Sequence, residues 1–315
     1  MAPGSPGRIW RERIVRKLVA KVAALTIAAA GTLAIAGPAA AQGHQAEHAS
    51  HGTTVLVHGD GTNVTLSRSS VNEGRISFKV ISSNSTPGAG SQITLFRLFG
   101  NATLDTFKAD LGDEFSSDPM TAAKGTGELN RDIRAFGLAD VVTGNPAMVT
   151  ERLTAGRYYL MDLGNNQGVP DPTFTTFTVR HSGRGLSDRQ GDSLHGPVVK
   201  LTSADRFISP RTLPARGTVT VRNVADTIHF MSIGPVKKGT TDKQIQAYFD
   251  SGSQDPPPFG VDGPSVGMDV LSPGRQLQLT YNLPPGTYVL MCFIADDVTG
   301  MPHAIMGMHK VVTLK

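Results

Sequence analysis

The residues best suited to chemistry gather near the C-terminus, in the run GTYVLMCFIADDVTGMPHAIMGMHKVV. Cys292, the only cysteine of the chain, is followed there by His303, Met306, Met308 and His309. Thiolate, imidazole and thioether groups brought together by one strand-loop-strand segment are a ligand set that copper prefers. The alternative is that Cys292 is a small apolar residue packed in a core strand, which is the usual role of a lone cysteine.

A targeting segment at the N-terminus bears on this choice. Six basic residues precede an apolar stretch at 22–36 and a candidate cleavage site, Ala39-x-Ala41: Arg8, Arg11, Arg13, Arg16, Lys17 and Lys21. The pattern predicts a secretory signal peptide over residues 1–41, with an uncleaved N-terminal anchor as the alternative. The apolar stretch is short for a transmembrane span and no second candidate occurs, so we expect a secreted, extracytoplasmic protein without a membrane span after cleavage. An unpaired cysteine in an oxidising compartment suggests an intermolecular bond, a reactive thiol or a metal ligand.

The charge of the chain resides mostly in that segment. Removal of residues 1–41 takes away the six basic residues and Glu12, so the formal net charge falls from +4 to −1. Nucleic-acid binding depends on clustered Lys and Arg that neutralise phosphates. We therefore expect no nucleic-acid partner.

The segment 42–52 that follows is polar and rich in histidine, and a flexible, solvated tail is the default expectation. Cleavage after Ala41 would expose Gln42-Gly43-His44, however. A free amine, two amides and the imidazole of His44 would then form a square-planar nitrogen set suited to Cu(II). A second, N-terminal copper site at His44 is thus an open possibility, which cyclisation of Gln42 would abolish.

The rest of the chain exceeds the usual size of one domain, and its Gly, Pro, Thr and Val content with short alternating runs predicts an all-β protein. A polar stretch at 181–195 is the predicted linker between two halves, 53–180 and 196–315. The halves resemble each other, because ERLTAGRYYLM at 151–161 corresponds to TYNLPPGTYVLM at 280–291. We therefore expect two tandem domains.

Short helices and alternating strands are predicted in matching places. The segments 103–111 and 241–249 have helical character, and Thr241 and Gln244 have the spacing of a capping box. In YVLMCF, alternation puts Tyr288, Leu290 and Cys292 on one face of a strand. Each half is thus predicted to be a Greek-key β-sandwich with one short helical insertion.

The second half resembles the cupredoxin superfamily, the plastocyanin-like and azurin-like blue-copper domains. In that family an early His follows an Asn-containing turn, as in Asn223-Val-Ala-Asp-Thr-Ile-His229, and the remaining ligands lie on the loop between the last two strands. The spacing His303-x4-Met308 matches the plastocyanin-like pattern. The resemblance implies one type-1-like copper site with these ligands: His229, Cys292, His303, and Met308 as the weak axial ligand, with Met306 as the alternative axial ligand.

Two features depart from the family pattern. Ten residues separate Cys292 from His303, which is longer than in small blue-copper carriers and nearer the long loop of copper nitrite reductases. Phe230 stands where many of these domains have an Asn that ties the ligand loops together. His309, by contrast, is expected to be an ordinary solvent-facing strand residue.

The first half is expected to carry no type-1 copper. Asp162 occupies the position of Cys292, Asp171 that of His303, and the segment 91–94 contains no histidine. The expected role of this half is structural. A separate site formed by Asp162 and Asp171 is the alternative.

Other chemistries lack support in the sequence. No GxSxG, HExxH, P-loop or dinucleotide fingerprint occurs in a suitable context, and no His-x-His pair suggests a type-2 or trinuclear copper centre. We expect an electron carrier or binding protein rather than an enzyme, although the sequence leaves the point open. The expected function is single-electron transfer or extracellular copper handling with an unidentified redox or cell-surface partner. A metal-free extracellular interaction or structural module with a cupredoxin-like scaffold is the alternative.

Overall fold

The computed structural model describes residues 53–85, 90–165, 170–183, 195–253 and 255–315. The predicted signal peptide 1–41 and the segment 42–52 with His44 lie outside the described residues, as does most of the predicted linker 181–195. Among the helices of the described ranges, none has the length and apolar character needed to span a membrane.

In its described residues, the first half contains these elements in order: β1 (Thr53–Gly59), β2 (Val64–Leu66), β3 (Ser70–Asn72), β4 (Gly74–Ser82), β5 (Gly90–Leu98), α2 (Leu104–Glu114), α3 (Pro119–Asp132), β6 (Ile133–Ala135), β7 (Asp140–Val142), β8 (Ala147–Leu153), β9 (Gly156–Asp162) and β10 (Thr175–Arg180). The second half repeats much of this order with β11 (Val198–Thr202), β12 (Arg206–Ile208), β13 (Thr212–Leu213), β14 (Arg216–Asn223), β15 (His229–Pro235), α4 (Asp242–Ser251), β16 (Val266–Leu271), β17 (Gln276–Asn282), β18 (Gly286–Met291), α5 (His303–Met306) and β19 (His309–Leu314).

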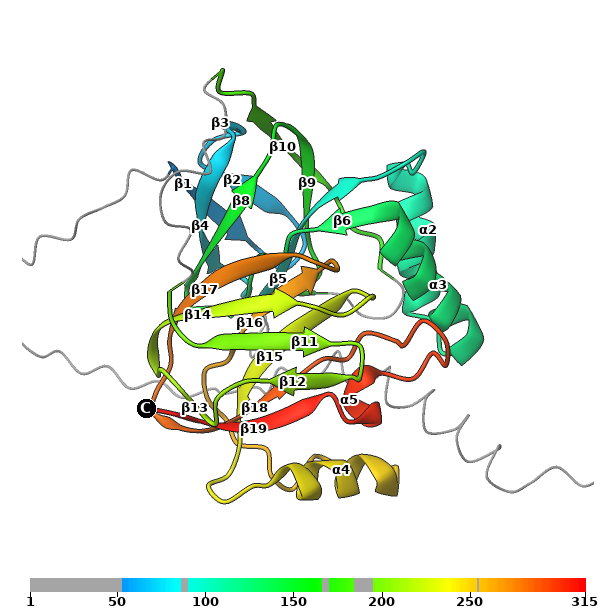
Figure 1. The fold of residues 1–315 in the computed structure, drawn as a ribbon, viewed down its shortest axis with the longest axis vertical. Helices are drawn as coiled ribbons and strands as arrows, with labels where there is room; N and C mark the ends of the chain where they lie inside the picture. Colours follow the sequence, from blue (N-terminus) through cyan, green and yellow to red (C-terminus); the bar gives the residue numbers. More distant parts are fainter. Residues whose placement is uncertain (1–52, 86–89, 166–169, 184–194, 254) are drawn as a thin grey trace, which may run out of the picture.

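The strands form two sheets, and each sheet runs through both halves (Figure 1). The eight-stranded sheet has the order β12-β11-β14-β17-β8-β4-β1-β2. The larger sheet has the order β13-β19-β18-β15-β16-β7-β5-β9-β10-β3, with β6 paired to β5. In each sheet the strands follow the same order from the centre of the sheet toward either edge, so that β8 corresponds to β17 and β9 to β18. The structure therefore confirms two tandem β-sandwich repeats.

The repeats join edge to edge within both sheets. In the smaller sheet β8 pairs antiparallel with β17, and Val149 lies opposite Leu279. In the larger sheet β7 pairs antiparallel with β16, and Val141 lies opposite Val266. One apolar core therefore extends through both repeats.

The predicted helices are present, together with one that the sequence did not predict. α2 and α4 both begin with a capping box, which in α4 joins Thr241 and Gln244 as expected. α3 gives the first repeat a second helix, which begins with Asp118 as N-cap and Pro119 in its first turn. Small residues and two glycines make its apolar pattern weak, which is why sequence periodicity missed it.

The alternation predicted for β18 is confirmed, and it decides where the cysteine lies. Tyr288, Leu290 and Cys292 belong to the core between the sheets. Val289 and Met291 face the other way, into a smaller apolar cluster that α4 covers. Cys292 therefore follows β18 into the interior of the second sandwich.

Candidate metal centre

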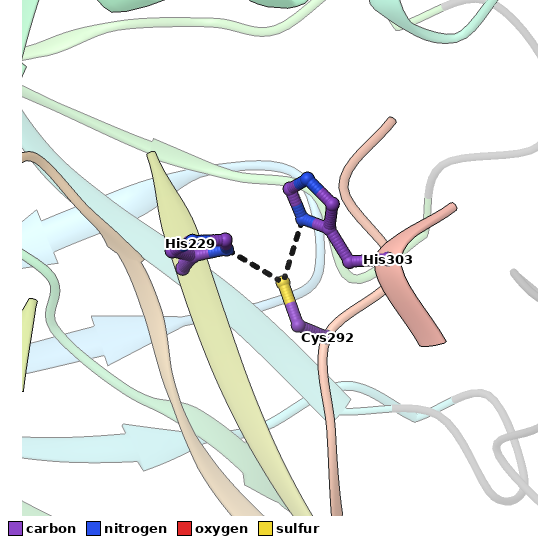
Figure 2. A group of neighbouring side chains, drawn as sticks. All are labelled: His229, Cys292 and His303. Carbon is purple, nitrogen blue, oxygen red and sulfur yellow. Dashed lines mark hydrogen bonds between the residues drawn. The ribbon is translucent and has the colours of Figure 1, made fainter. Parts of the chain in front are cut away.

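Three side chains that could bind a metal lie together inside the second repeat (Figure 2). The Sγ atom of Cys292 is 3.7 Å from Nδ1 of His229 and 3.7 Å from Nδ1 of His303. One ligand atom from each residue lies within 4.8 Å of the others, and all three residues have zero solvent exposure. The two imidazole rings are tilted by 57°, with centroids 4.6 Å apart.

His229 is the first residue of β15, and a buried asparagine fixes the turn that precedes it. The Nδ2 group of Asn223 donates to the carbonyl oxygens of Thr227 (2.8 Å) and Leu271 (2.7 Å). Its Oδ1 atom accepts from the N–H of Ala225 at 2.9 Å. The side chain of Asn223 thus holds the turn before His229 in place, whereas the side chain of Phe230 carries no amide that could do so.

The long segment between Cys292 and His303 folds back on itself. The N–H of His303 donates to the carbonyl of Ile294 at 3.0 Å, and Ala295 and Pro302 form an isolated β-bridge. At the tip, the carboxylate of Asp296 accepts from the N–H groups of Val298 and Thr299. This hairpin-like excursion closes the ten-residue gap and returns His303 beside Cys292.

Burial keeps the three groups neutral in the absence of a cation. Desolvation lowers the pKa of His229 to about 3, and the nearby His303 adds to the effect. Desolvation likewise lowers the pKa of His303 to about 4. The pKa of the Cys292 thiol is raised to about 12 by desolvation, against the opposing hydrogen bonds from the backbone of Phe230 and Ile294.

The donor set fits a copper ion. A metal cation between the three groups would compensate the charge of a buried thiolate, which the dry core otherwise disfavours. Neutral imidazoles are the form in which histidine binds metal. Two imidazoles and one thiolate are the equatorial donors that suit copper in electron-transfer sites.

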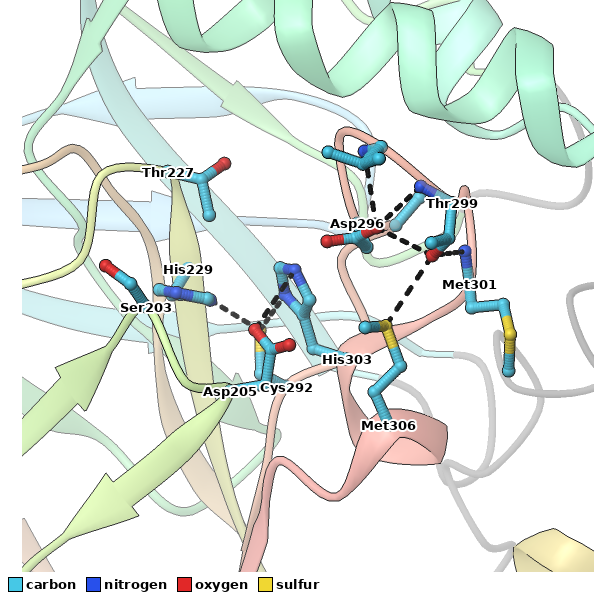
Figure 3. Close-up of polar contacts among 12 residues, drawn as sticks. Ser203, Asp205, Thr227, His229, Cys292, Asp296, Thr299, Met301, His303 and Met306 are labelled. Carbon is cyan, nitrogen blue, oxygen red and sulfur yellow. Dashed lines mark hydrogen bonds and ion pairs between the residues drawn. The ribbon is translucent and has the colours of Figure 1, made fainter.

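The two candidate axial methionines have different surroundings. Met308 has zero exposure and belongs to the same core cluster as Cys292, and its backbone carbonyl accepts from the N–H of Cys292 at 3.3 Å. The Sδ atom of Met306 accepts from Oγ1 of Thr299 at 3.7 Å (Figure 3). These positions favour Met308 as the axial candidate, and its role as a ligand stays a prediction.

The corresponding place in the first repeat holds a hydrogen-bonded carboxylate. Asp162 occupies the position of Cys292, and its oxygens accept from the backbone N–H groups of Gly61 (2.8 Å), Gln92 (2.9 Å) and Gly164 (2.9 Å). Asp171 is instead an exposed partner of Lys108, at 2.6 Å. Asp162 and Asp171 thus have separate partners, and the alternative of a site shared by these two residues has no support.

The first repeat braces the ligand loop of the second. The carboxylate of Glu114, at the end of α2, accepts from the N–H of Ala295 at 3.3 Å. Asn130 in α3 donates to the carbonyl of Asp226 at 2.9 Å. The helices of the first repeat thus lie beside the candidate metal site (Figure 3).

Two findings differ from the sequence expectations. His309 is buried rather than solvent-facing, and its Nε2 atom pairs with Oε1 of Gln246 at 3.0 Å, because α4 covers this face of the sheet. Asp205 was not predicted at the site, yet its Oδ1 atom lies 3.7 Å from Nε2 of His303. The one signal in the sequence that could have indicated Asp205 is the presence of an aspartate in a tight turn between two strands.

Comparisons with known proteins show similarity only to solved structures. No family model matches the chain, and no curated protein matches it. A reduced auracyanin from Roseiflexus castenholzii is 21% identical, over 38% of this chain and 94% of that one, with a TM-score of 0.23. The multicopper oxidase McoA from Aquifex aeolicus is 11% identical, over 83% of this chain and 65% of that one, with a TM-score of 0.23.

The type of fold follows from the way in which the strands pair. Each repeat is a two-sheet sandwich in which the first strand pairs in parallel with a later strand, β1 with β4 and β11 with β14. The last strand pairs in parallel with a short one, β10 with β3 and β19 with β13. The fold is cupredoxin-like, in tandem.

Proposed function

We propose that this chain is a secreted electron-transfer protein that binds one type-1-like copper through His229, Cys292 and His303, with Met308 as the weak axial ligand. The observation that carries the proposal is the buried group of one thiol and two imidazoles within 4.8 Å. Copper, when bound, supplies a centre that accepts and releases one electron. The chain supplies donors held in place, a dry environment and a fixed geometry.

The rigidity of the site supports electron transfer over copper storage. His229 is held by a strand and by the Asn223 network, and His303 by a backbone hydrogen bond to Ile294. Ligands that do not move when the charge of the metal changes keep the reorganisation small, as electron transfer requires. A storage site exchanges its metal with carriers, which the zero exposure of all three donors opposes.

The decisive experiment adds one equivalent of Cu(II) to the mature protein and records the visible spectrum. An equatorial thiolate predicts an intense absorption that bleaches on reduction and returns on oxidation. Cys292→Ser should fold and lose the band. His309→Gln is the matched control, because His309 lies in the same segment but pairs with Gln246, and this variant should keep the band.

Other outcomes identify the alternatives. Colourless binding that disappears when residues 42–52 are deleted would assign copper to the N-terminal His44 site. Colourless binding that survives this deletion would indicate copper handling. Absence of copper binding by the folded protein would leave the metal-free interaction or structural module.

Secretion is part of the proposal and has its own test. The signal-peptide prediction for residues 1–41 expects a mature chain that begins at Gln42. Expression in a secreting host followed by mass spectrometry of the extracytoplasmic protein measures the new N-terminus. Retention of residues 1–41 on a membrane-bound product would support the anchor instead.

A further inference from the structure

Nδ1 of each candidate histidine ligand faces the cysteine, and Nε2 of each is buried with no hydrogen-bond partner among the residues that the structure describes. For His303 this second atom, Nε2, points toward the carboxylate of Asp205, 3.7 Å away (Figure 3). The histidine has zero exposure and the carboxylate is 17% exposed. A contact of this length becomes a hydrogen bond with a small movement, and such bonds are often long before a site is loaded.

The backbone of Asp205 is unusual in a way that favours a role for its side chain. Among the residues that the structure describes, Asp205 is the one non-glycine with a positive φ, at 51°. It ends the turn between β11 and β12, where its N–H donates to the carbonyl of Thr202 at 3.0 Å. Glycine is preferred at such a left-handed position, although Asp tolerates it better than most residues. A strained position that keeps a carboxylate points to a function for that carboxylate.

A neighbouring arginine fastens this turn to the ligand-bearing segment. Nη1 of Arg206 donates to the carbonyl of Asp205 at 2.7 Å and to the carbonyl of Met306 at 3.2 Å. Its guanidinium group also lies against Gly307, where a Cβ atom would come within 2.7 Å of Nη1. The turn and the segment that carries His303 are therefore held at a fixed distance.

We propose that Asp205 is a positioning residue for the metal site, whose carboxylate holds the proton of His303 on Nε2 and so leaves Nδ1 free to bind metal beside Cys292. A histidine has one proton to share between two nitrogens when it is neutral, so an acceptor at Nε2 decides which nitrogen can be a ligand. Carboxylates that accept from the outer nitrogen of a ligating histidine orient the ring and raise its basicity. The inference rests on the proposed copper function for its purpose, and its main test needs no metal.

The first test measures the tautomer of His303 in the metal-free protein by long-range ¹H–¹⁵N NMR. In the wild type we expect the proton on Nε2. Asp205→Gly removes the carboxylate while it suits the positive φ, so the turn should remain folded, and a share of the population should move to the Nδ1–H tautomer. Asp205→Asn keeps an oxygen acceptor and tolerates this backbone, so it should restore the Nε2–H form.

The control is Asp226→Ala, which removes an exposed carboxylate that also acts electrostatically on the site, through His229. It should leave the tautomer of His303 unchanged. An unchanged tautomer in Asp205→Gly, or an equal change in Asp226→Ala, would overturn the assignment.

The second test measures affinity for Co(II), a probe that forms a thiolate absorption band without oxidising the thiol. Loss of a partner of a ligating histidine typically weakens metal binding by about 10-fold to 100-fold, which is the effect expected for Asp205→Gly relative to Asp226→Ala. Equal affinities of these two variants would overturn the proposal. A tautomer that responds to Asp205→Gly in a protein whose wild type gives no thiolate band with Cu(II) would contradict the copper function and leave the positioning role standing.

Discussion

The peptide N–H of Ala295, in the ligand loop of the second repeat, donates to the carboxylate of Glu114 in the first repeat at 3.3 Å. A second contact supports it, because Gly300 lies so close to the carbonyl oxygen of Pro119 that a Cβ atom there would overlap it. The first repeat therefore fixes the loop that closes the candidate metal site. The contacts of Glu114 and Pro119 thus give the first repeat a structural role.

A methyl group at Gly300 should disturb this contact. Gly300 has φ +67°, and Gly274 has φ +72° with nothing near its would-be Cβ atom. Gly274→Ala should cost about 1 kcal/mol for the left-handed backbone alone. Gly300→Ala should cost about 1–3 kcal/mol more, since Pro119 must move. The measurement is the free energy of unfolding in denaturant, and equal values for the two variants would show that the repeats separate freely at this contact.

The axial assignment predicts different results for the two methionines. Met308→Leu should keep copper bound but shift the visible spectrum and the reduction potential, because the weak axial ligand tunes both. Met306→Leu should change neither, since the Sδ atom of Met306 pairs with Thr299. Spectra and redox titrations of both loaded variants provide the test, and the reverse pattern would assign the axial position to Met306.

Copper binding should release one proton near neutral pH. The pKa of the Cys292 thiol is about 12, whereas those of His229 and His303 are about 3 and about 4. At pH 7 only the thiol must lose a proton to become a ligand, so affinity should rise about tenfold per pH unit over pH 5–8. Proton release can be followed by calorimetry in buffers of different ionisation enthalpy. Release of no proton would show that the thiolate does not bind.

The stability of the metal-free protein should depend on pH through the carboxyl group of Asp140, which lies where β7 pairs with β16. Desolvation raises its pKa to about 7, with further contributions from Asp269 and Asp162. A carboxyl with a raised pKa stabilises the fold while it is protonated, so its contribution declines as pH rises from about 4 to about 7. His229 and His303 act oppositely, because their lowered pKa values cost stability as pH falls below 6.5.

The comparison of wild type with Asp140→Asn isolates the carboxyl, because the histidine contribution is common to both proteins. The wild type should lose stability relative to the variant between pH 5 and pH 7, as measured by denaturant midpoints. A constant difference across this range would show that Asp140 titrates normally.

The sequence was sufficient to predict the features that depend on residues close together in the chain. Alternation along 288–293 placed Cys292 on the core face, and the capping box at Thr241 and Gln244 marked the start of α4. Both patterns reflect local geometry, a period of two in a strand and the unpaired N–H groups at a helix start. The tandem repeat could be recognised in the sequence for the same reason, since the two halves contain similar local patterns.

Tertiary structure alone decided the features that join distant segments. His229 and Cys292 are 63 residues apart and meet because β15 pairs with β18, and no local pattern fixes that pairing. The continuation of both sheets across the repeats and the bracing of the ligand loop by Glu114 also depend on long-range contacts. Asp205 reaches His303 through a turn almost a hundred residues earlier in the chain. The spacing of residues in the sequence can indicate which donors form a site. Only the packing of the strands decides which further residue contacts each donor, because the burial and the direction of a side chain are properties of the whole fold.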